Sequence, residues 1–247
     1  MTPAPPPIRQ ERTILDFEGA RIPVYVARPE RDPSATVLML GAIWSVTPHI
    51  EDLCDRLAAV GFAAVAPCLF RGAGIPARDA PPDVLRQTFL DFDDVRCIRD
   101  VRAVARATSH GDFGFAPRAL VPLGFCLGGR FAHYLGAISV HVAGVVNFYG
   151  RLRFARQPAK PFLPIELAGL IEVPYLGHFA QTDDLIPLPD VEELRTALAR
   201  RGIPYRIEVY EGARHGFVDP ERPTEHHPEA AARAWATTLA FLGELRA

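Results

Sequence analysis

The chain has 247 residues, with 27 lysines and arginines against 29 aspartates and glutamates, a formal charge of −2 and 49% hydrophobic residues. This near-neutral balance lacks the positive surplus of nucleic-acid binders, and no apolar run approaches the roughly 18 residues of a membrane span, so we expect neither kind of partner. Four cysteines without paired short spacing argue against a disulfide framework and against a zinc site. We therefore expect a cytoplasmic monomer or homodimer with free thiols, no metal and no cofactor.

Strand-like and helix-like apolar patterns alternate along most of the chain. Residues 1–11 are proline-rich and expected to be flexible, and strands at 13–17 and 22–27 are expected to pair as an antiparallel edge. Further strands are predicted at 36–40, 62–66, 119–124, 142–148, 175–180 and 205–210. Helices are predicted at 48–60, 84–107, 127–136, 190–200 and 228–245, and a long Gly/Pro/Ala-rich loop at 71–82.

This alternation is typical of a mostly parallel sheet with helices on both faces. The sequence shows no internal repeat, no charge block and no linker that would divide the chain. We therefore predict one α/β domain over residues 1–247.

The most informative segment is GFCLGG at residues 124–129, where a predicted strand turns directly into a helix. The G-x-nucleophile-x-G pattern predicts a strained turn that exposes its central residue, here Cys126, above the sheet. The helix N-terminus favours a thiolate, and the N–H of Leu127 is one expected donor of an oxyanion hole. The alternative is a buried cysteine in a glycine-rich turn, which is how we interpret the remaining three: Cys54, Cys68 and Cys97.

A thiol nucleophile needs a base, and the base needs an orienting acid. In an α/β-hydrolase sheet the chain order is nucleophile, acid, base. Asp183 and Asp184 follow one predicted strand and His215 follows the next, so all lie at the edge where such sheets bind ligands. Either aspartate has the alternative role of a helix cap, and His178, inside a strand, is the closest rival base. The ordered set nevertheless predicts a catalytic triad.

The chain resembles the dienelactone hydrolase family of α/β-hydrolases from about Thr13 to its C-terminus. The matching pieces are GFCLGG at the turn, NFYG at 147–150, TDDLIP around the acid, YEGARHGF around the histidine, and AAARAWATTLAFL near the C-terminus. The resemblance implies the α/β-hydrolase fold, with a mostly parallel central sheet between helices. It also implies hydrolysis of a small ester or lactone without a cofactor.

Carried over by position, the resemblance implies specific roles for residues of this chain. Cys126 takes the place of the nucleophile, His215 that of the base and Asp183 that of the acid, because the family's acid lies four residues before a proline, here Pro187. The backbone N–H of Ile43 takes the place of the second oxyanion donor.

Two positions depart from the family pattern. Ala42 stands where the family has a glutamate that helps to form the thiolate, and Asp219 stands where dienelactone hydrolases carry an arginine that binds the substrate carboxylate. An aspartate there is expected to repel such a substrate, and three arginines are candidates to replace the lost one: Arg71, Arg86 and Arg214. These departures leave open a weakly active or non-catalytic protein that binds a small ligand in the same cleft. Acyl transfer and thiol redox sensing are further alternatives.

Aromatic residues near the expected strand ends are candidates for the substrate pocket. They are Trp44, Phe70, Phe125, Tyr149 and Phe217. Each of them is equally an ordinary core residue. A largely aromatic wall would suit an apolar or aromatic acyl group better than a dicarboxylate.

Overall fold

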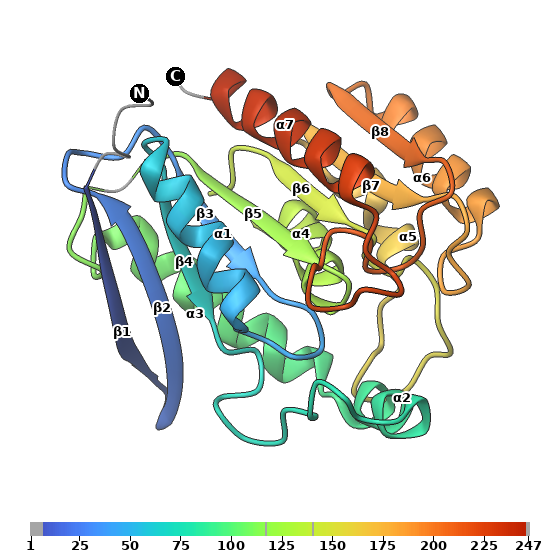
Figure 1. Ribbon diagram of the computed structural model, residues 1–247, viewed down its shortest axis with the longest axis horizontal. Coiled ribbons are helices and arrows are strands. Elements are labelled where there is room, and N and C mark those ends of the chain that lie inside the picture. Colours follow the sequence, from blue (N-terminus) through green and yellow to red (C-terminus); the bar gives the residue numbers. More distant parts are fainter. Residues whose placement is uncertain (1–6, 117, 140, 246–247) are drawn as a thin grey trace.

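A computed structural model describes residues 7–116, 118–139 and 141–245, and a single sheet runs through it with helices on both faces (Figure 1). In sheet order the strands are β1 (Ile8–Phe17), β2 (Ala20–Pro29), β4 (Ala63–Pro67), β3 (Thr36–Leu40), β5 (Leu120–Phe125), β6 (Val145–Phe148), β7 (Tyr175–Ala180) and β8 (Tyr205–Tyr210). The helices are α1 (Pro48–Ala59), α2 (Pro82–Asp91), α3 (Asp94–His110), α4 (Leu127–Ile138), α5 (Pro164–Leu167) with a 3-10 turn (Ala168–Leu170), α6 (Leu188–Arg201) and α7 (Pro228–Glu244). The predicted α/β class is confirmed.

The first two strands form the antiparallel edge that the sequence predicted. Glu18 and Gly19 both have positive φ, at 49° and 78°, which is the backbone of a tight two-residue hairpin. The expectation of a flexible segment over residues 1–11 is wrong for residues 8–11, because β1 begins at Ile8, which pairs with Pro29. Residues 1–6 lie outside the described residues. β2 also pairs antiparallel with β4, and all later strand pairs are parallel.

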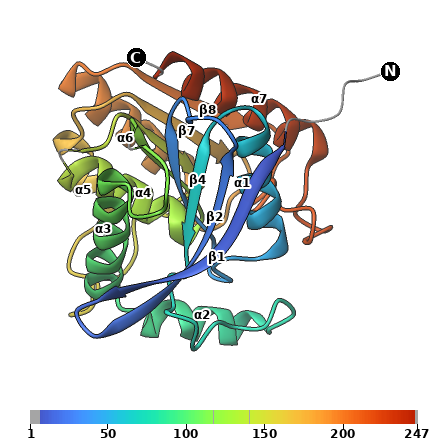
Figure 2. The same ribbon diagram turned by 90° about the vertical axis from the view of Figure 1, so that its left-hand side faces the viewer.

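The single helix expected over residues 84–107 is two helices, α2 and α3. Phe92 leaves the helical conformation with ψ at 127°, and the Asp93 side chain accepts a hydrogen bond from the N–H of Arg96 at 2.9 Å, which caps α3. An aspartate within an apolar helical pattern can therefore start a new helix. None of the residues of α2 is buried, and the helix lies at the rim of the molecule (Figure 2).

Two helices cover one face of the sheet and the remaining long helices pack on the other. α1 and α7 lie in front in Figure 1, whereas α3 and α4 lie behind, and α6 is linked to α4 through the 3-10 turn between them. β3 and β4 are buried along their whole length, as their continuous apolar sequence predicts. None of the described helices is both long and apolar enough to cross a membrane. The parallel strands end at one common edge, and the candidate site lies there.

Candidate active site

Cys126 occupies the sharp turn between β5 and α4. Its φ of 53° and ψ of −109° are rare for a residue with a side chain. The turn is held on both sides, because the Cys126 N–H donates to the carbonyl oxygen of Phe148 at 2.9 Å and the Arg130 N–H donates to the Cys126 carbonyl at 3.2 Å. Strain of this kind is concentrated at functional sites and persists only where the surroundings enforce it.

The glycines two residues before and after Cys126 allow three backbone segments to meet. A Cβ atom on Gly124 would lie 2.1 Å from the carbonyl oxygen of Gly128, and one on Gly128 would lie 2.0 Å from that of Leu40. Side chains at these positions are therefore excluded by backbone atoms. The G-x-C-x-G spacing reflects the contact of β5 with α4, and of α4 with the end of β3.

The structure brings Cys126, His215 and Asp183 together at the ends of β5, β8 and β7. The Nδ1 atom of His215 lies 2.8 Å from Asp183 Oδ2, and Asp183 Oδ1 accepts a hydrogen bond from the N–H of Leu185 at 2.9 Å. The other ring nitrogen, Nε2, is buried and has no hydrogen-bond partner within the described residues, while the charge of Cys126 acts on the His215 ring. Asp184 is exposed to solvent, so the choice of Asp183 as the acid agrees with this geometry.

The electrostatics of Cys126 and His215 favour a charged thiolate. Burial raises the pKa of the Cys126 thiol, but the positive charge of His215 and the N–H of Leu127 lower it by more, so its pKa lies below the usual thiol value. Burial lowers the pKa of His215, but the charge of Cys126 and the hydrogen bond to Asp183 raise it by more, so its pKa lies well above the usual value. Both directions favour a thiolate–imidazolium pair.

The rival histidine is part of the core. Both ring nitrogens of His178 are used, Nδ1 at 2.8 Å from the Tyr210 hydroxyl and Nε2 at 3.0 Å from Thr238 Oγ1. The side chain is fully buried, and burial lowers its pKa to about 3. His178 is therefore a neutral structural residue, which leaves His215 as the candidate base.

Two backbone amides stand where oxyanion donors are expected. Leu127 begins α4, and its N–H lowers the pKa of the Cys126 thiol. Ile43 is buried in the loop after β3, and its N–H donates no hydrogen bond within the part of the chain that the structure describes. A tight turn fixes this loop, since the Ser45 N–H donates to the Ala42 carbonyl at 2.8 Å. An oxyanion hole needs two such N–H donors, so Leu127 and Ile43 stay the candidate pair.

Three of the five predicted pocket aromatics line a small cavity beside Ala42. These are Trp44, Phe125 and Tyr149. The ring of Tyr149 also lies 5.1 Å from that of His215. Phe217 is fully buried behind it, 5.4 Å from Tyr149, and Phe70 packs against Phe92 at 4.8 Å, so neither ring lines this cavity.

The charge of Asp219, which also lines this cavity, is balanced by an arginine that the sequence did not single out. Arg78 lies 2.8 Å from Asp219 and 3.1 Å from Glu221, and its guanidinium stacks 4.4 Å from the Trp44 ring. Arg78 belongs to the long Gly/Pro-rich loop, where no periodic pattern assigns a direction to a side chain. Arg71, one of the expected substitutes, is instead bound to Asp100 at 2.6 Å.

Comparison with known proteins agrees with this site. A model of the dienelactone hydrolase family matches residues 22–246. The chain belongs to the dienelactone hydrolase family. A protein of Escherichia coli K12 named "Putative carboxymethylenebutenolidase" is 31% identical over 230 residues, which cover 92% of this chain and 84% of the relative. A protein of the same name from Methylorubrum extorquens is 30% identical over 90% of this chain and 76% of its own length.

A solved structure, described as a "Putative Dienelactone Hydrolase" from Klebsiella pneumoniae, superimposes with a TM-score of 0.85 at 29% identity, covering 95% of this chain and 98% of that one. The expected α/β-hydrolase fold is confirmed. This dienelactone hydrolase family member is thus a hydrolase of ester bonds.

Proposed function

We propose that this dienelactone hydrolase family member cleaves a small carboxylic ester or lactone with Cys126 as its nucleophile. The observation that carries the proposal is the strained position of Cys126 next to a histidine whose far nitrogen is held by Asp183 at 2.8 Å. A nucleophile, a base and an orienting acid in this arrangement are typical of catalytic triads that catalyse acyl transfer. The cytoplasmic location, the small-molecule partner and the oligomeric state stay predictions from the sequence.

In the proposed reaction these groups act in two steps. The Cys126 thiolate attacks the carbonyl carbon, and the resulting oxyanion accepts hydrogen bonds from the N–H groups of Leu127 and Ile43. His215 gives its proton to the leaving alkoxide as the carbon–oxygen bond breaks, which leaves a thioester on Cys126. His215 then removes a proton from water, the hydroxide attacks the thioester, and the acid product leaves as the thiolate re-forms. Asp183 keeps the ring oriented throughout.

Activation of the thiol here needs no glutamate at position 42. Ala42 lines the small cavity, and the groups that lower the pKa of Cys126 are His215 and the N–H of Leu127 in the first turn of α4. The alternative is a weakly active or non-catalytic protein that binds a ligand in the same cleft. The two differ in the reactivity of the thiol, because an unactivated cysteine reacts slowly at neutral pH.

Alkylation by iodoacetamide separates these two possibilities. We expect the rate for Cys126 to rise with pH to a plateau, with a midpoint below the value of about 8.5 for an ordinary thiol. In His215→Gln the positive charge is lost and burial dominates, so the midpoint should move above about 8.5. Peptide mass spectrometry against time follows each cysteine. Cys54 and Cys97, whose pKa burial raises, are internal controls that should stay unlabelled at pH 7. A Cys126 rate no faster than theirs would favour the non-catalytic alternative.

Ala42→Glu tests whether the missing glutamate limits activity. A carboxylate close to the thiolate should raise the pKa of Cys126 by about one unit, which reduces the thiolate fraction by up to about tenfold. We therefore expect kcat/KM at pH 7 to fall, by up to about tenfold, on esters and lactones that the wild type cleaves. Initial rates on a panel of both substrate types give the comparison. A rise in lactone hydrolysis would instead identify the glutamate as the limiting group.

A further inference from the structure

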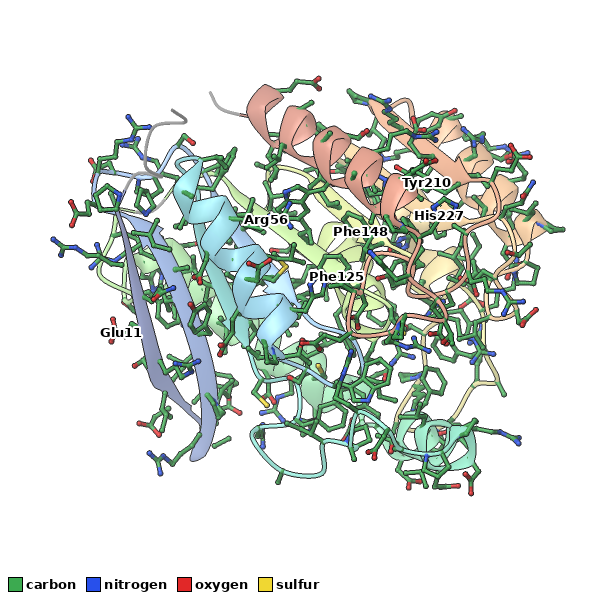
Figure 3. The ribbon with its side chains drawn as sticks, in the orientation of Figure 1. Glu11, Arg56, Phe125, Phe148, Tyr210 and His227 are labelled. Atoms are coloured by element: carbon green, nitrogen blue, oxygen red, sulfur yellow. The ribbon has the colours of Figure 1, made fainter. Side chains whose placement is uncertain are left out.

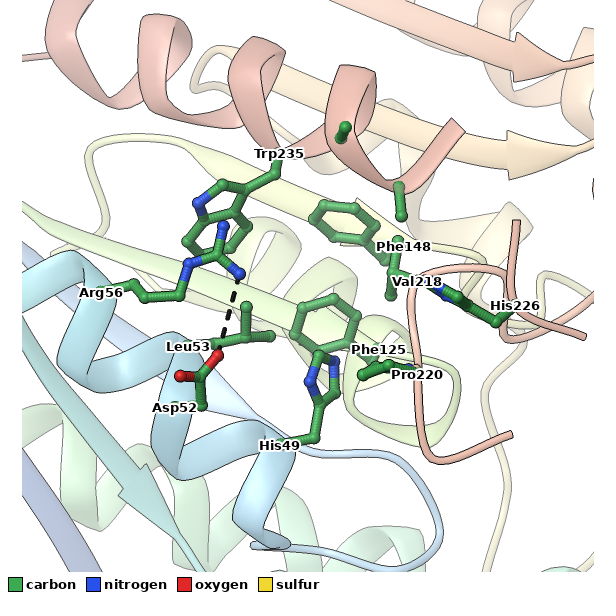
Figure 4. A pocket seen from close by; sticks show the side chains of 12 residues that line it. His49, Asp52, Leu53, Arg56, Phe125, Phe148, Val218, Pro220, His226 and Trp235 are labelled. Carbon is green, nitrogen blue, oxygen red and sulfur yellow. Dashed lines mark ion pairs between the residues drawn. The ribbon is translucent and has the colours of Figure 1, made fainter. Parts of the chain in front are cut away.

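A groove with a volume of about 300 Å³ lies between α1 and α7 (Figure 4). This volume is at the lower end of the range for small-molecule sites, about 300–1,000 Å³. Its floor is made by the rings of Phe125 and Phe148, whose centroids are 4.7 Å apart, and Trp235 closes one end. Figure 3 places the two phenylalanines between these helices. The groove therefore offers flat apolar surfaces to a ring.

The topology of the sheet produces this groove. α1 packs mainly on β2 and β4, and α7 packs on β7, so the ends of β5 and β6 between them are not covered by a helix on this face. Phe125 and Phe148 are the last residues of these two strands. Open α/β sheets bind ligands at the carboxyl ends of strands where the connections diverge.

Two histidines that line the groove each have a ring nitrogen that makes no hydrogen bond among the described residues. Nε2 of His49 is buried and has no hydrogen-bond partner among the described residues, and burial lowers the pKa of His49, so the ring is neutral. Nδ1 of His226 donates to the Phe217 carbonyl at 3.1 Å, which makes its Nε2 an acceptor in the neutral ring. An unpaired buried nitrogen costs free energy that a ligand oxygen would recover.

The charges in the groove are balanced. The Arg56 guanidinium stacks 4.9 Å from the Trp235 ring, and its Nη1 lies 3.8 Å from Asp52 Oδ2. One positive and one negative group face the same space, so the groove has no surplus charge to attract an ion. A neutral ligand fits this balance better than a carboxylate does.

The groove adjoins the small cavity beside Ala42. His49 and Phe125 line both the groove and the small cavity beside Ala42. Val218 and Pro220, which also line the groove, follow His215 in the same loop. A substrate held at Cys126 therefore has a neighbouring space for its distal group.

We propose that the groove between α1 and α7 binds the neutral aromatic part of the ester substrate, stacked on Phe125 and Phe148, with a hydroxyl or carbonyl oxygen on Nε2 of His49. The assignment rests on the proposed function for the identity of the ligand as substrate. Binding of an aromatic ligand in the groove does not require turnover, because the groove and its polar atoms exist independently of Cys126. Binding and hydrolysis can therefore be tested separately.

Binding is tested with benzyl alcohol and the fluorescence of Trp235. The chain has two tryptophans, so Cys126→Ala combined with Trp44→Phe leaves Trp235 as the reporter and removes turnover. We expect saturable quenching by benzyl alcohol. Buffer without ligand and sodium benzoate at equal concentration should cause none. His49→Leu in this background should weaken binding about tenfold. Absence of quenching, or equal quenching by benzoate, would overturn the proposal.

The kinetic test fills the groove from α7. Ala231 lines the groove, whereas Ala236 is exposed on the same helix and does not line it, so Ala236→Phe is the matched control for Ala231→Phe. We expect Ala231→Phe to raise KM for benzyl acetate about tenfold and to leave kcat and the KM for ethyl acetate within about twofold. Equal effects of the two variants would overturn the proposal. Quenching of Trp235 without any ester hydrolysis would support the groove and contradict the proposed function.

Discussion

Cys126→Ala is expected to lower kcat at least about 10⁴-fold on any ester that the wild type hydrolyses, because the thioester cannot form. The substitution should leave the fold intact, because the turn is held by the backbone N–H and carbonyl of Cys126, which alanine keeps, and the side chain interacts with His215. KM should change little, because the substrate contacts of the cleft remain. Initial rates over a range of substrate concentrations, with circular dichroism to verify folding, measure both quantities.

The histidine supplies the control for this prediction. His215→Ala removes the base and also the charge that lowers the pKa of Cys126, so its loss in kcat should be comparable. The double variant should lose scarcely more than either single variant, because the two residues act as one unit. If the losses in kcat were additive, or if Cys126→Ala kept the wild-type rate, another group would have to attack the carbonyl.

Sequence reasoning located the candidate triad because each member follows a strand, and the chain order limits the choices. The pattern around Cys126 predicts a turn that only glycine neighbours permit, and the backbone contacts of Gly124 and Gly128 give the physical reason. His178 could not be dismissed from the sequence, since its two hydrogen bonds come from β8 and α7, both distant in the chain.

The sequence failed where long loops meet. The Arg78–Asp219 ion pair joins residues 141 positions apart, and no local pattern predicts it. The same holds for the groove, whose walls come from α1, α7 and the loop after β8. The break between α2 and α3 was missed for a different reason, because one capping aspartate outweighed a continuous apolar periodicity.

The proposed oxyanion donors depend on the same close contacts that shape the turn. Gly128 lies in the first turn of α4, directly against the end of β3, and the loop with Ile43 follows that strand. A shift of α4 away from β3 would therefore separate the Leu127 and Ile43 amides. Stability and catalysis should fail together at this position.

Gly128→Ala is expected to destabilise the protein by about 3 kcal/mol or more and to lower kcat at least about 10²-fold. The added Cβ would lie 2.0 Å from the Leu40 carbonyl oxygen and 2.5 Å from that of Gly41, and backbone atoms cannot rotate aside as a side chain can. Urea unfolding followed by circular dichroism gives the free energy, and ester hydrolysis gives kcat.

Gly243→Ala is the matched control for this change. Gly243 lies in α7, and a Cβ atom there would have no neighbour within 4 Å among the described residues. Alanine favours a helix over glycine by up to about 1 kcal/mol, so this variant should be as stable as the wild type or slightly more so, with unchanged kcat. If Gly128→Ala proved equally harmless, α4 would have room to move from β3, and the spacing of the two glycines around Cys126 would need another explanation.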